Sequence, residues 1–320
     1  GAVTGFDLRG ALGRPTAPLT VLDGRFALDI AGDSVANLSG AAQLTADRSL
    51  VDSVRIFGAR AALRFGSGRV YVDSARVESA AGEVSARGAL GLSPAVSDTL
   101  RFQFNADSLG GLRRYLARGG DGPAGADSLA GTLRATGVVT GSASRFALDA
   151  SVDGAGLRLR GTTARTIRGT VALSALPDSA TGTVTLRLDA LHAGTAVFNE
   201  GELRADLLGG WQARTTAQFT APSGVRARGL ADVRRVGDTT LVRIDSLWAR
   251  TSGNVWALAR PASIAWNTRG FRLDTLVLAG AQGGRIDARG RTSALDTIGV
   301  ALRADGVPLA DIGELIQTRE

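Results

Sequence analysis

The sequence lacks cysteine, lysine and methionine, and it contains a single histidine. Without cysteine, the chain forms no disulfide and no cysteine-containing zinc site. No apolar run reaches the roughly 18 residues that a membrane-spanning helix needs, and no signal peptide is visible. Because even position 1 is not methionine, we expect this chain to be a middle piece of a longer protein, whose targeting or anchoring segments lie outside it.

All 37 basic side chains are arginines, and the formal net charge is +7. One explanation is affinity for phosphate, either in nucleic acid or in lipid head groups. The other is a GC-rich genome, which favours arginine, alanine and glycine codons. The second explanation is favoured because the arginines are scattered beside aspartates rather than clustered. We therefore predict no nucleic-acid partner.

The residues of catalytic and cofactor sites are also missing. His192 lies in the stretch Leu191-His192-Ala193-Gly194, which we interpret as a turn, and the chain has no nucleophile elbow of the Gly-x-Ser-x-Gly type. Gly66-Ser67-Gly68 lacks the rest of a dinucleotide-binding fingerprint. We predict that the protein is not an enzyme and that it uses no cofactor or metal ion.

Alternation of apolar and polar residues is the main structural signal. Residues 146–153 alternate in this way, and residues 184–189 and 203–207 repeat the pattern. A period of two is typical of β-strands in a sheet that is solvated on one face. The 43 glycines and only 8 prolines fit short strands joined by tight turns. The sequence therefore predicts an all-β, repetitive and mainly antiparallel sheet.

One signature recurs five times: an apolar residue, any residue, Ala or Leu, then Arg and Gly. Its glycines are separated by 78, 73, 68 and 61 residues. We interpret it as the end of a strand, where the glycine allows a bulge or turn. The copies span 6–10, 84–88, 157–161, 225–229 and 286–290.

A second signature is Asp followed by Ser or Thr inside an apolar run. Such a pair can bond nearby backbone groups, which favours a strand kink or turn. So many copies indicate architecture rather than catalysis. The four clearest copies begin at Asp52, Asp73, Asp245 and Asp274.

The two signatures combine into a longer repeat, because residues 69–116 resemble residues 270–316. Each ends in a predicted short helix, at 107–116 and at 308–317, with Asp107 as a candidate cap of the first. The Gly-rich residues 118–126 are the clearest break in the chain. We predict one β-repeat segment at 1–117, a loop at 118–126 and a second β-repeat segment at 127–320.

The stretch 254–290 and the segment that follows it carry a family resemblance. In order, they contain Trp-Ala-Leu from Trp256, Ile-Ala-Trp from Ile264, an apolar run at 271–278, Gly-x-Ile-x-Ala-Arg-Gly ending at Gly290, and Val-Pro-Leu-Ala-Asp-Ile from Val307. This order is similar to the repeat region of TamB and AsmA-like proteins. The strands at 131–150 resemble the repeats of the same family.

The resemblance implies a long curved sheet, folded like a taco, with an apolar concave face. Family members bridge the inner and outer membranes of diderm bacteria, and phospholipid acyl chains are thought to slide along their groove. The expected setting is the periplasm, with an inner-membrane anchor and all membrane contact outside this chain. An outer-membrane barrel protein of the assembly machinery is a further expected partner.

We predict that one apolar face forms this lipid groove. The alternatives are a scaffold for outer-membrane protein assembly and a passive β-solenoid adhesin. The same side chains would also suit the core of an ordinary two-sheet sandwich. The predicted groove residues are Phe102, Phe104, Phe146, Leu148, Val152, Val184, Leu186, Leu188, Trp256, Leu258, Ile264, Trp266, Leu276 and Leu278.

Overall fold

A computed structural model of the chain shows an all-β fold, with 21 strands in an antiparallel sheet in which consecutive strands pair. It describes residues 1–7, 9–10, 20–34, 37–51, 54–112, 129–159, 161–193, 196–267, 270–292, 298–308 and 310–311. The chain divides into two compact units. Unit 1 contains residues 1–160 and 170–178, and unit 2 contains residues 161–169 and 179–320. The predicted loop at 118–126 lies outside the described residues.

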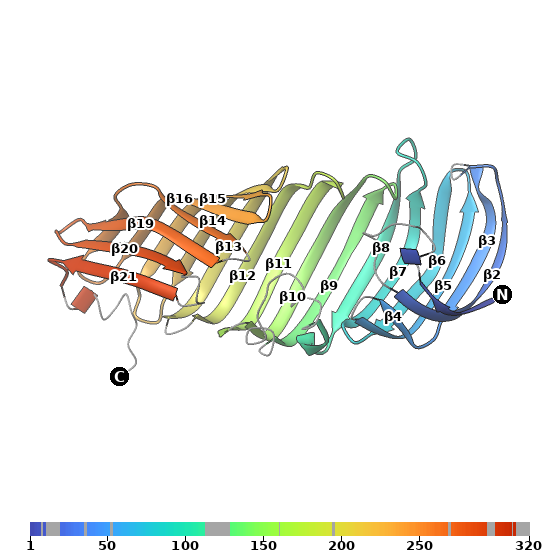
Figure 1. Cartoon of the computed structure of the whole chain (residues 1–320), viewed down its shortest axis with the longest axis horizontal. Coiled ribbons are helices and arrows are strands. Elements are labelled where there is room, and N and C mark those ends of the chain that lie inside the picture. Colours follow the sequence, from blue (N-terminus) through green and yellow to red (C-terminus); the bar gives the residue numbers. More distant parts are fainter. Residues whose placement is uncertain are drawn as a thin grey trace. The chain divides into compact units, whose positions relative to one another are not determined.

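Unit 1 is built from strands that lie side by side in chain order (Figure 1). Strands β3 and β4 both pair with β2 and β5, so together they act as one broken strand. The strands of unit 1 are β1 (Ala2–Phe6), β2 (Thr20–Ala31), β3 (Ser39–Ala46), β4 (Ser49–Val51), β5 (Val54–Gly66), β6 (Arg69–Ser79), β7 (Gly82–Gly91), β8 (Asp98–Ala106), β9 (Ala130–Gly141) and β10 (Phe146–Leu159). Strand β11 (Thr162–Leu176) contributes residues to both units.

Unit 2 repeats this plan and also contains a broken strand. Its β17 and β18 both pair with β16 and β19, and residues 259–261 separate the two strands. The strands of unit 2 are β12 (Thr181–Ala193), β13 (Ala196–Gly209), β14 (Gln212–Thr220), β15 (Arg226–Val236), β16 (Thr239–Arg250), β17 (Val255–Leu258), β18 (Ala262–Asn267), β19 (Gly270–Gly280), β20 (Arg285–Thr292) and β21 (Ile298–Asp305). The alternating segments at 184–189 and 203–207 lie within β12 and β13, so these predicted strands are confirmed.

Short hairpin turns connect many of these strands. Ser67 and Gly68 join β5 to β6 with φ of 52° and 67°, and Gly210 and Trp211 join β13 to β14 with φ of 56° and 60°. Two successive positive φ angles are typical of the hairpin turn whose twist matches its strands. Gly66-Ser67-Gly68, which the sequence analysis compared with a dinucleotide-binding fingerprint, is therefore part of a hairpin turn.

The two predicted helices are described only in part. Within 107–116 the structure has a single 3-10 turn, η2 (Leu109–Leu112), and residues 113–116 lie outside the described residues. Within 308–317, Ala310 and Asp311 are helical, and most of the remaining positions lie outside the described residues. No α-helix of several turns is therefore seen in the described ranges.

Candidate functional site

The β-pairing register of unit 1 brings apolar residues together in rows that cross its strands. One row runs from Phe26 on β2 to Ala150 on β10, and it contains no polar residue. Its members, each opposite the next, are Phe26, Leu44, Ala61, Ala75, Ala86, Phe102, Gly137 and Ala150. Because successive residues of a strand point to opposite faces, the rows one residue away face the other side. One such row is Arg25, Thr45, Arg60, Arg76, Ser85, Gln103, Thr136 and Ser151.

Unit 2 has an apolar face of its own, which follows from its β-pairing register in the same way. A row that crosses nine strands there contains Gly182, Leu207, Ala213, Val233, Val242, Ile264, Leu273, Gly290 and Val300. A parallel row contains Leu188, Gly201, Phe219, Ala227, Ala249, Trp256 and Gly280. We call these surfaces the apolar face of unit 1 and the apolar face of unit 2.

Every predicted groove residue lies on one of these two faces. Phe102, Phe104, Phe146, Leu148 and Val152 belong to unit 1. The unit 2 members are Val184, Leu186, Leu188, Trp256, Leu258, Ile264, Trp266, Leu276 and Leu278. Their exposure differs: Trp256 is fully buried, Trp266 is 43% exposed, and the others are half-buried. Whether they touch lipid remains a prediction.

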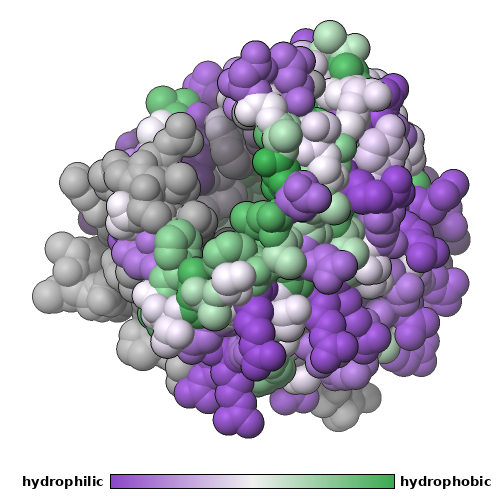
Figure 2. All heavy atoms as spheres, turned by 90° about the vertical axis from the view of Figure 1, so that its right-hand side faces the viewer, coloured by the Kyte–Doolittle hydropathy of each residue, from purple (hydrophilic) through white to green (hydrophobic). Residues whose placement is uncertain are grey.

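The apolar faces are not covered in the way that a sandwich core is covered. A sandwich needs a second sheet about 10 Å above the first, whereas the described strands of each unit follow one another edge to edge in one sheet. Large apolar side chains of β2 and β3 stay open to solvent, with Leu28 55% and Leu44 41% exposed. Figure 2 views this end of unit 1 and shows hydrophobic side chains around a hollow, with hydrophilic side chains outside.

The opposite, polar face is crossed by arginine–carboxylate ion pairs. Arg64 of β5 binds Asp73 of β6 through two hydrogen bonds of 2.7 and 2.6 Å. Arg214 of β14 reaches Asp232 of β15 at 3.0 Å. In unit 2 an Arg-x-Asp sequence also pairs within one strand, at 204–206, 243–245, 272–274, 285–287 and 303–305. We did not predict these pairs, although the recurring Arg-x-Asp spacing was visible.

Two of these contacts favour the charged form of the carboxylate. The hydrogen bond from Arg214 lowers the pKa of Asp232, and the bond from Arg64 likewise lowers the pKa of Asp73. In return, each carboxylate raises the pKa of its arginine. The side chains are largely in water, where an ion pair contributes little stability. For Asp73 and Asp232, the clearest effect is that the carboxylate stays ionised to a lower pH than an unpaired aspartate would.

The Asp-Ser and Asp-Thr pairs lie at β-bulges. The register shifts by one residue at Asp73, at Asp245 and at Asp274, so the predicted strand kink is confirmed there. The predicted bonding partner was wrong, because each carboxylate binds an arginine side chain. Asp52 lies outside the described residues.

The two sequence signatures meet at these bulges. Arg87 lies opposite the bulge of Asp73 and donates a hydrogen bond from Nε to the Asp73 carbonyl at 2.9 Å. The next residue, Gly88, has φ of 135°, and a Cβ there would lie 2.3 Å from the carbonyl oxygen of Thr99. Arg289 occupies the same place opposite the bulge of Asp274. The Arg-Gly copies at 84–88 and 286–290 therefore lie within strands, not at their ends, and Gly88 permits close approach of the next strand.

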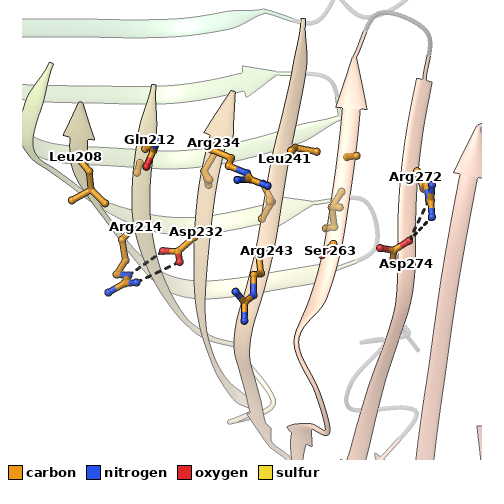
Figure 3. Close-up of a pocket in the computed structure, with 15 residues that line it drawn as sticks. Leu208, Gln212, Arg214, Asp232, Arg234, Leu241, Arg243, Ser263, Arg272 and Asp274 are labelled. Carbon is orange, nitrogen blue, oxygen red and sulfur yellow. Dashed lines mark hydrogen bonds and ion pairs between the residues drawn. The ribbon is translucent and has the colours of Figure 1, made fainter. Parts of the chain in front are cut away.

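The polar face of unit 2 also holds a cavity of about 700 Å³ (Figure 3). Its lining includes Arg234 and Arg272, with the smaller Ser263 between them. Two of its arginines already bind carboxylates of the same lining, in the Arg214–Asp232 and Arg272–Asp274 pairs. Ile264 also touches this cavity, but its pairing with Leu273 places its side chain on the apolar face. The cavity is charged and is therefore a poor site for an acyl chain.

Comparisons with family models, with curated proteins and with solved structures find no match. The assignment of function therefore rests on the chain's own geometry. Within the described ranges, no helix is long and apolar enough to cross a membrane. In the same ranges, no group of three or more histidine or acidic side chains is placed to hold a metal ion.

A buried polar cluster lies beside the apolar face of unit 2, where the chain leaves β21. The Asp311 carboxylate is 1% exposed and accepts hydrogen bonds from the Thr251 hydroxyl at 2.8 Å and the Trp256 indole N–H at 3.3 Å. The Trp256 ring packs so closely on Gly280 and Gly284 that a Cβ on either would lie about 3 Å from it. Trp256 therefore anchors the segment after β21 rather than offering an open surface.

His192 is not in a turn, so that interpretation was wrong. It lies near the end of β12, half-buried, with Val197 of β13 opposite. The strand continues through Ala193 because β13 pairs with it to that point. Its neighbours in the hairpin are apolar, and no acidic side chain is seen to bind it among the described residues.

Proposed function

We propose that the apolar faces of the two units bind phospholipid acyl chains. In this proposal the chain is a segment of a periplasmic protein that carries phospholipids between the inner and outer membranes of a diderm bacterium. One observation supports it most: rows of apolar side chains cross whole units, and no second sheet covers them within the described ranges. A large exposed apolar surface in a soluble protein usually marks a binding site.

The chemistry of the faces suits an acyl chain. A hydrocarbon chain needs no hydrogen-bonding partner and gains about 0.8 kcal/mol for each methylene group removed from water. In unit 1 the rows cross eight strands, and seven spacings of about 4.8 Å give a path of about 34 Å. In the row that contains Phe102, every residue along this path is apolar or glycine. A chain can therefore move along it without exchanging hydrogen bonds.

The alternatives explain less of this geometry. An assembly scaffold for outer-membrane proteins would offer strand edges, but strands such as β6 and β15 have both edges paired. A solenoid adhesin would bury its apolar side chains in a filled core, whereas Leu28 and Leu44 stay exposed. Neither function requires apolar rows that remain accessible.

Site-specific photo-crosslinking tests the proposal. A benzophenone amino acid replaces Leu148, on the apolar face, or Asp149, the next residue and on the polar face. The chain is incubated with vesicles that contain a tritiated phospholipid, then irradiated. We expect labelled lipid on the Leu148 variant and little on the Asp149 variant. Equal labelling at the two positions, or none at either, would contradict the proposal.

A further inference from the structure

One rim of the apolar face of unit 2 carries an arginine between two tryptophans. Each residue of this rim lies two positions from a member of the row that contains Val233 and Ile264, so both rows share the face. Trp211 joins the rim through its carbonyl, which accepts the backbone N–H of Arg235 at 3.1 Å. We call these residues the rim row. Each opposite the next, they are Trp211, Arg235, Thr240, Trp266 and Phe271.

The rim row is open to water, whereas the opposite rim of the same strands is covered. Trp211 is 78% exposed and Trp266 is 43% exposed. At the other ends of β14, β15 and β16, the residues Ala221, Val225 and Thr251 are only 2%, 6% and 6% exposed. A ligand with one part that must stay in water can therefore place that part at the rim row and not at the opposite rim.

Arg235 differs from the arginines of the polar face in its partners. Its Nε donates to the Gly237 carbonyl at 3.2 Å, and its guanidinium carbon lies 6.0 Å from the centre of the Trp211 ring. Within the described ranges it forms no ion pair, and Asp238 in the same hairpin turn accepts a hydrogen bond from the Thr239 hydroxyl instead. A guanidinium has five N–H donors, and the bond to Gly237 uses one of them.

We propose that Arg235 binds the phosphate of a phospholipid whose acyl chains lie on the apolar face of unit 2, with Trp211 and Trp266 on either side of the head group. This inference rests on the proposed function of that face. Arginine binds phosphate through two parallel N–H···O bonds. Tryptophan is enriched where lipid head groups meet hydrocarbon, because its ring is apolar and its N–H is polar.

The apolar face below Arg235 is wide enough for an acyl chain. From Arg235 to Ala227, strand β15 rises about 27 Å, at about 3.4 Å per residue. The acyl layer of one membrane leaflet is about 15 Å thick, half of the hydrocarbon core. Between these ends, the residues that share the face are Val233, Ala231 and Gly229. Acyl chains that start at Arg235 therefore meet only apolar residues and glycine along this strand.

Arg234 provides a matched comparison. It is the next residue along β15 and is also exposed, but its side chain lines the charged cavity of the polar face (Figure 3). A phosphate bound by Arg234 would have the sheet between it and the apolar face. The proposal therefore requires Arg235 and not Arg234.

Native mass spectrometry of the whole chain with two lipids tests the proposal. Dioleoylphosphatidylglycerol and dioleoylglycerol have the same acyl chains, but only the first carries a phosphate. We expect the native chain to bind the phosphate lipid at least about tenfold more tightly. Arg235→Gln should reduce this preference to within about threefold without weakening the binding of dioleoylglycerol, whereas Arg234→Gln should keep the preference.

A second variant keeps the arginine and its contacts in the hairpin turn. Thr240→Glu places a carboxylate opposite Arg235, so it should compete with phosphate and reduce the preference as Arg235→Gln does. Glycerol phosphate, which has no acyl chain, should not displace the lipid at an equal concentration. Displacement would identify a site for free phosphate and would overturn the proposal.

The remaining outcomes separate this proposal from the function on which it rests. Equal binding of both lipids by the native chain would overturn the head-group site and leave acyl-chain binding intact. The same conclusion follows from a preference that survives both Arg235→Gln and Thr240→Glu, or that Arg234→Gln reduces equally. Binding of neither lipid by the native chain would contradict the proposed function itself, and the head-group site with it.

Discussion

Replacing Leu186 by glutamate separates an open apolar face from a closed core. Leu186 is half-buried on β12, lies opposite Leu203 and packs over Gly169. On an open face the new carboxylate can turn toward water. The cost is then mainly the lost packing of a half-buried leucine, about 1–2 kcal/mol, since full burial contributes about 1.5–3 kcal/mol. In a closed core the carboxylate would be buried without a partner, which costs about 3–5 kcal/mol or more.

The melting temperature distinguishes these magnitudes. For a unit of this size, 1 kcal/mol shifts Tm by about 2–4 °C. We therefore expect Leu186→Glu to lower Tm by about 2–8 °C and to leave a folded β protein by circular dichroism. Bound phospholipid, measured by native mass spectrometry, should fall at least about tenfold because the acyl path now contains a charge.

Thr185→Glu is the matched control. It is the next residue along β12, lies on the polar face and has Arg204 opposite as a counter-charge. It should keep both its Tm and its bound lipid. Unfolding of Leu186→Glu would show that a covered core lies above this face. A folded Leu186→Glu that retains its lipid would remove this residue from the path and refute the reasoning.

Three further predictions concern polar groups. Asp311→Ala leaves the Trp256 indole N–H without its acceptor, whereas the Thr251 hydroxyl can still donate to the Asn254 carbonyl at 3.1 Å. We therefore expect a loss of about 1–3 kcal/mol in the free energy of unfolding, measured with denaturant. Asp245→Asn keeps an oxygen that can accept from arginine at the bulge, so bound lipid in the same mass-spectrometric assay should stay within a fewfold. The hydrogen bond from Arg214 lowers the pKa of Asp232. The stability that this ion pair contributes is therefore present above the ordinary pKa of aspartate and is lost as pH falls through the lowered pKa. Below about pH 4, Tm should fall more steeply with pH in the native chain than in Asp232→Asn.

The sequence predicted the strands and the apolar faces because both depend on local alternation. Residues two apart on a strand share a face, so the alternation at 146–152 was enough to assign Phe146 and Leu148 to one face. Phe102 and Ala150 are 48 positions apart in the sequence, and they share a row because both lie opposite Gly137. That pairing is not specified by any single strand.

The missed features depend on those pairings. A strand kink or turn at Asp73 was expected from its sequence, but its partner Arg64 lies on another strand and becomes visible only with the register. The same holds for Arg87, whose Arg-Gly signature was assigned to a strand end and lies instead opposite a bulge. Trp256 was assigned to an open groove, and its burial depends on Asp311, which is distant in the sequence.

The arginine-rich composition has a structural use in a sheet with one uncovered apolar face. Such a sheet gains no stability from a second layer on that side, so its polar face supplies the remaining side-chain contacts between strands. Arginine suits this task better than lysine because its planar group binds a carboxylate through two parallel hydrogen bonds, as Arg64 does with Asp73. It can also reach a backbone carbonyl across a bulge, as Arg87 does. Codon bias can explain why the chain contains many arginines, but it does not explain why their partners lie at the bulges. A role of the arginines in holding neighbouring strands together does predict that placement.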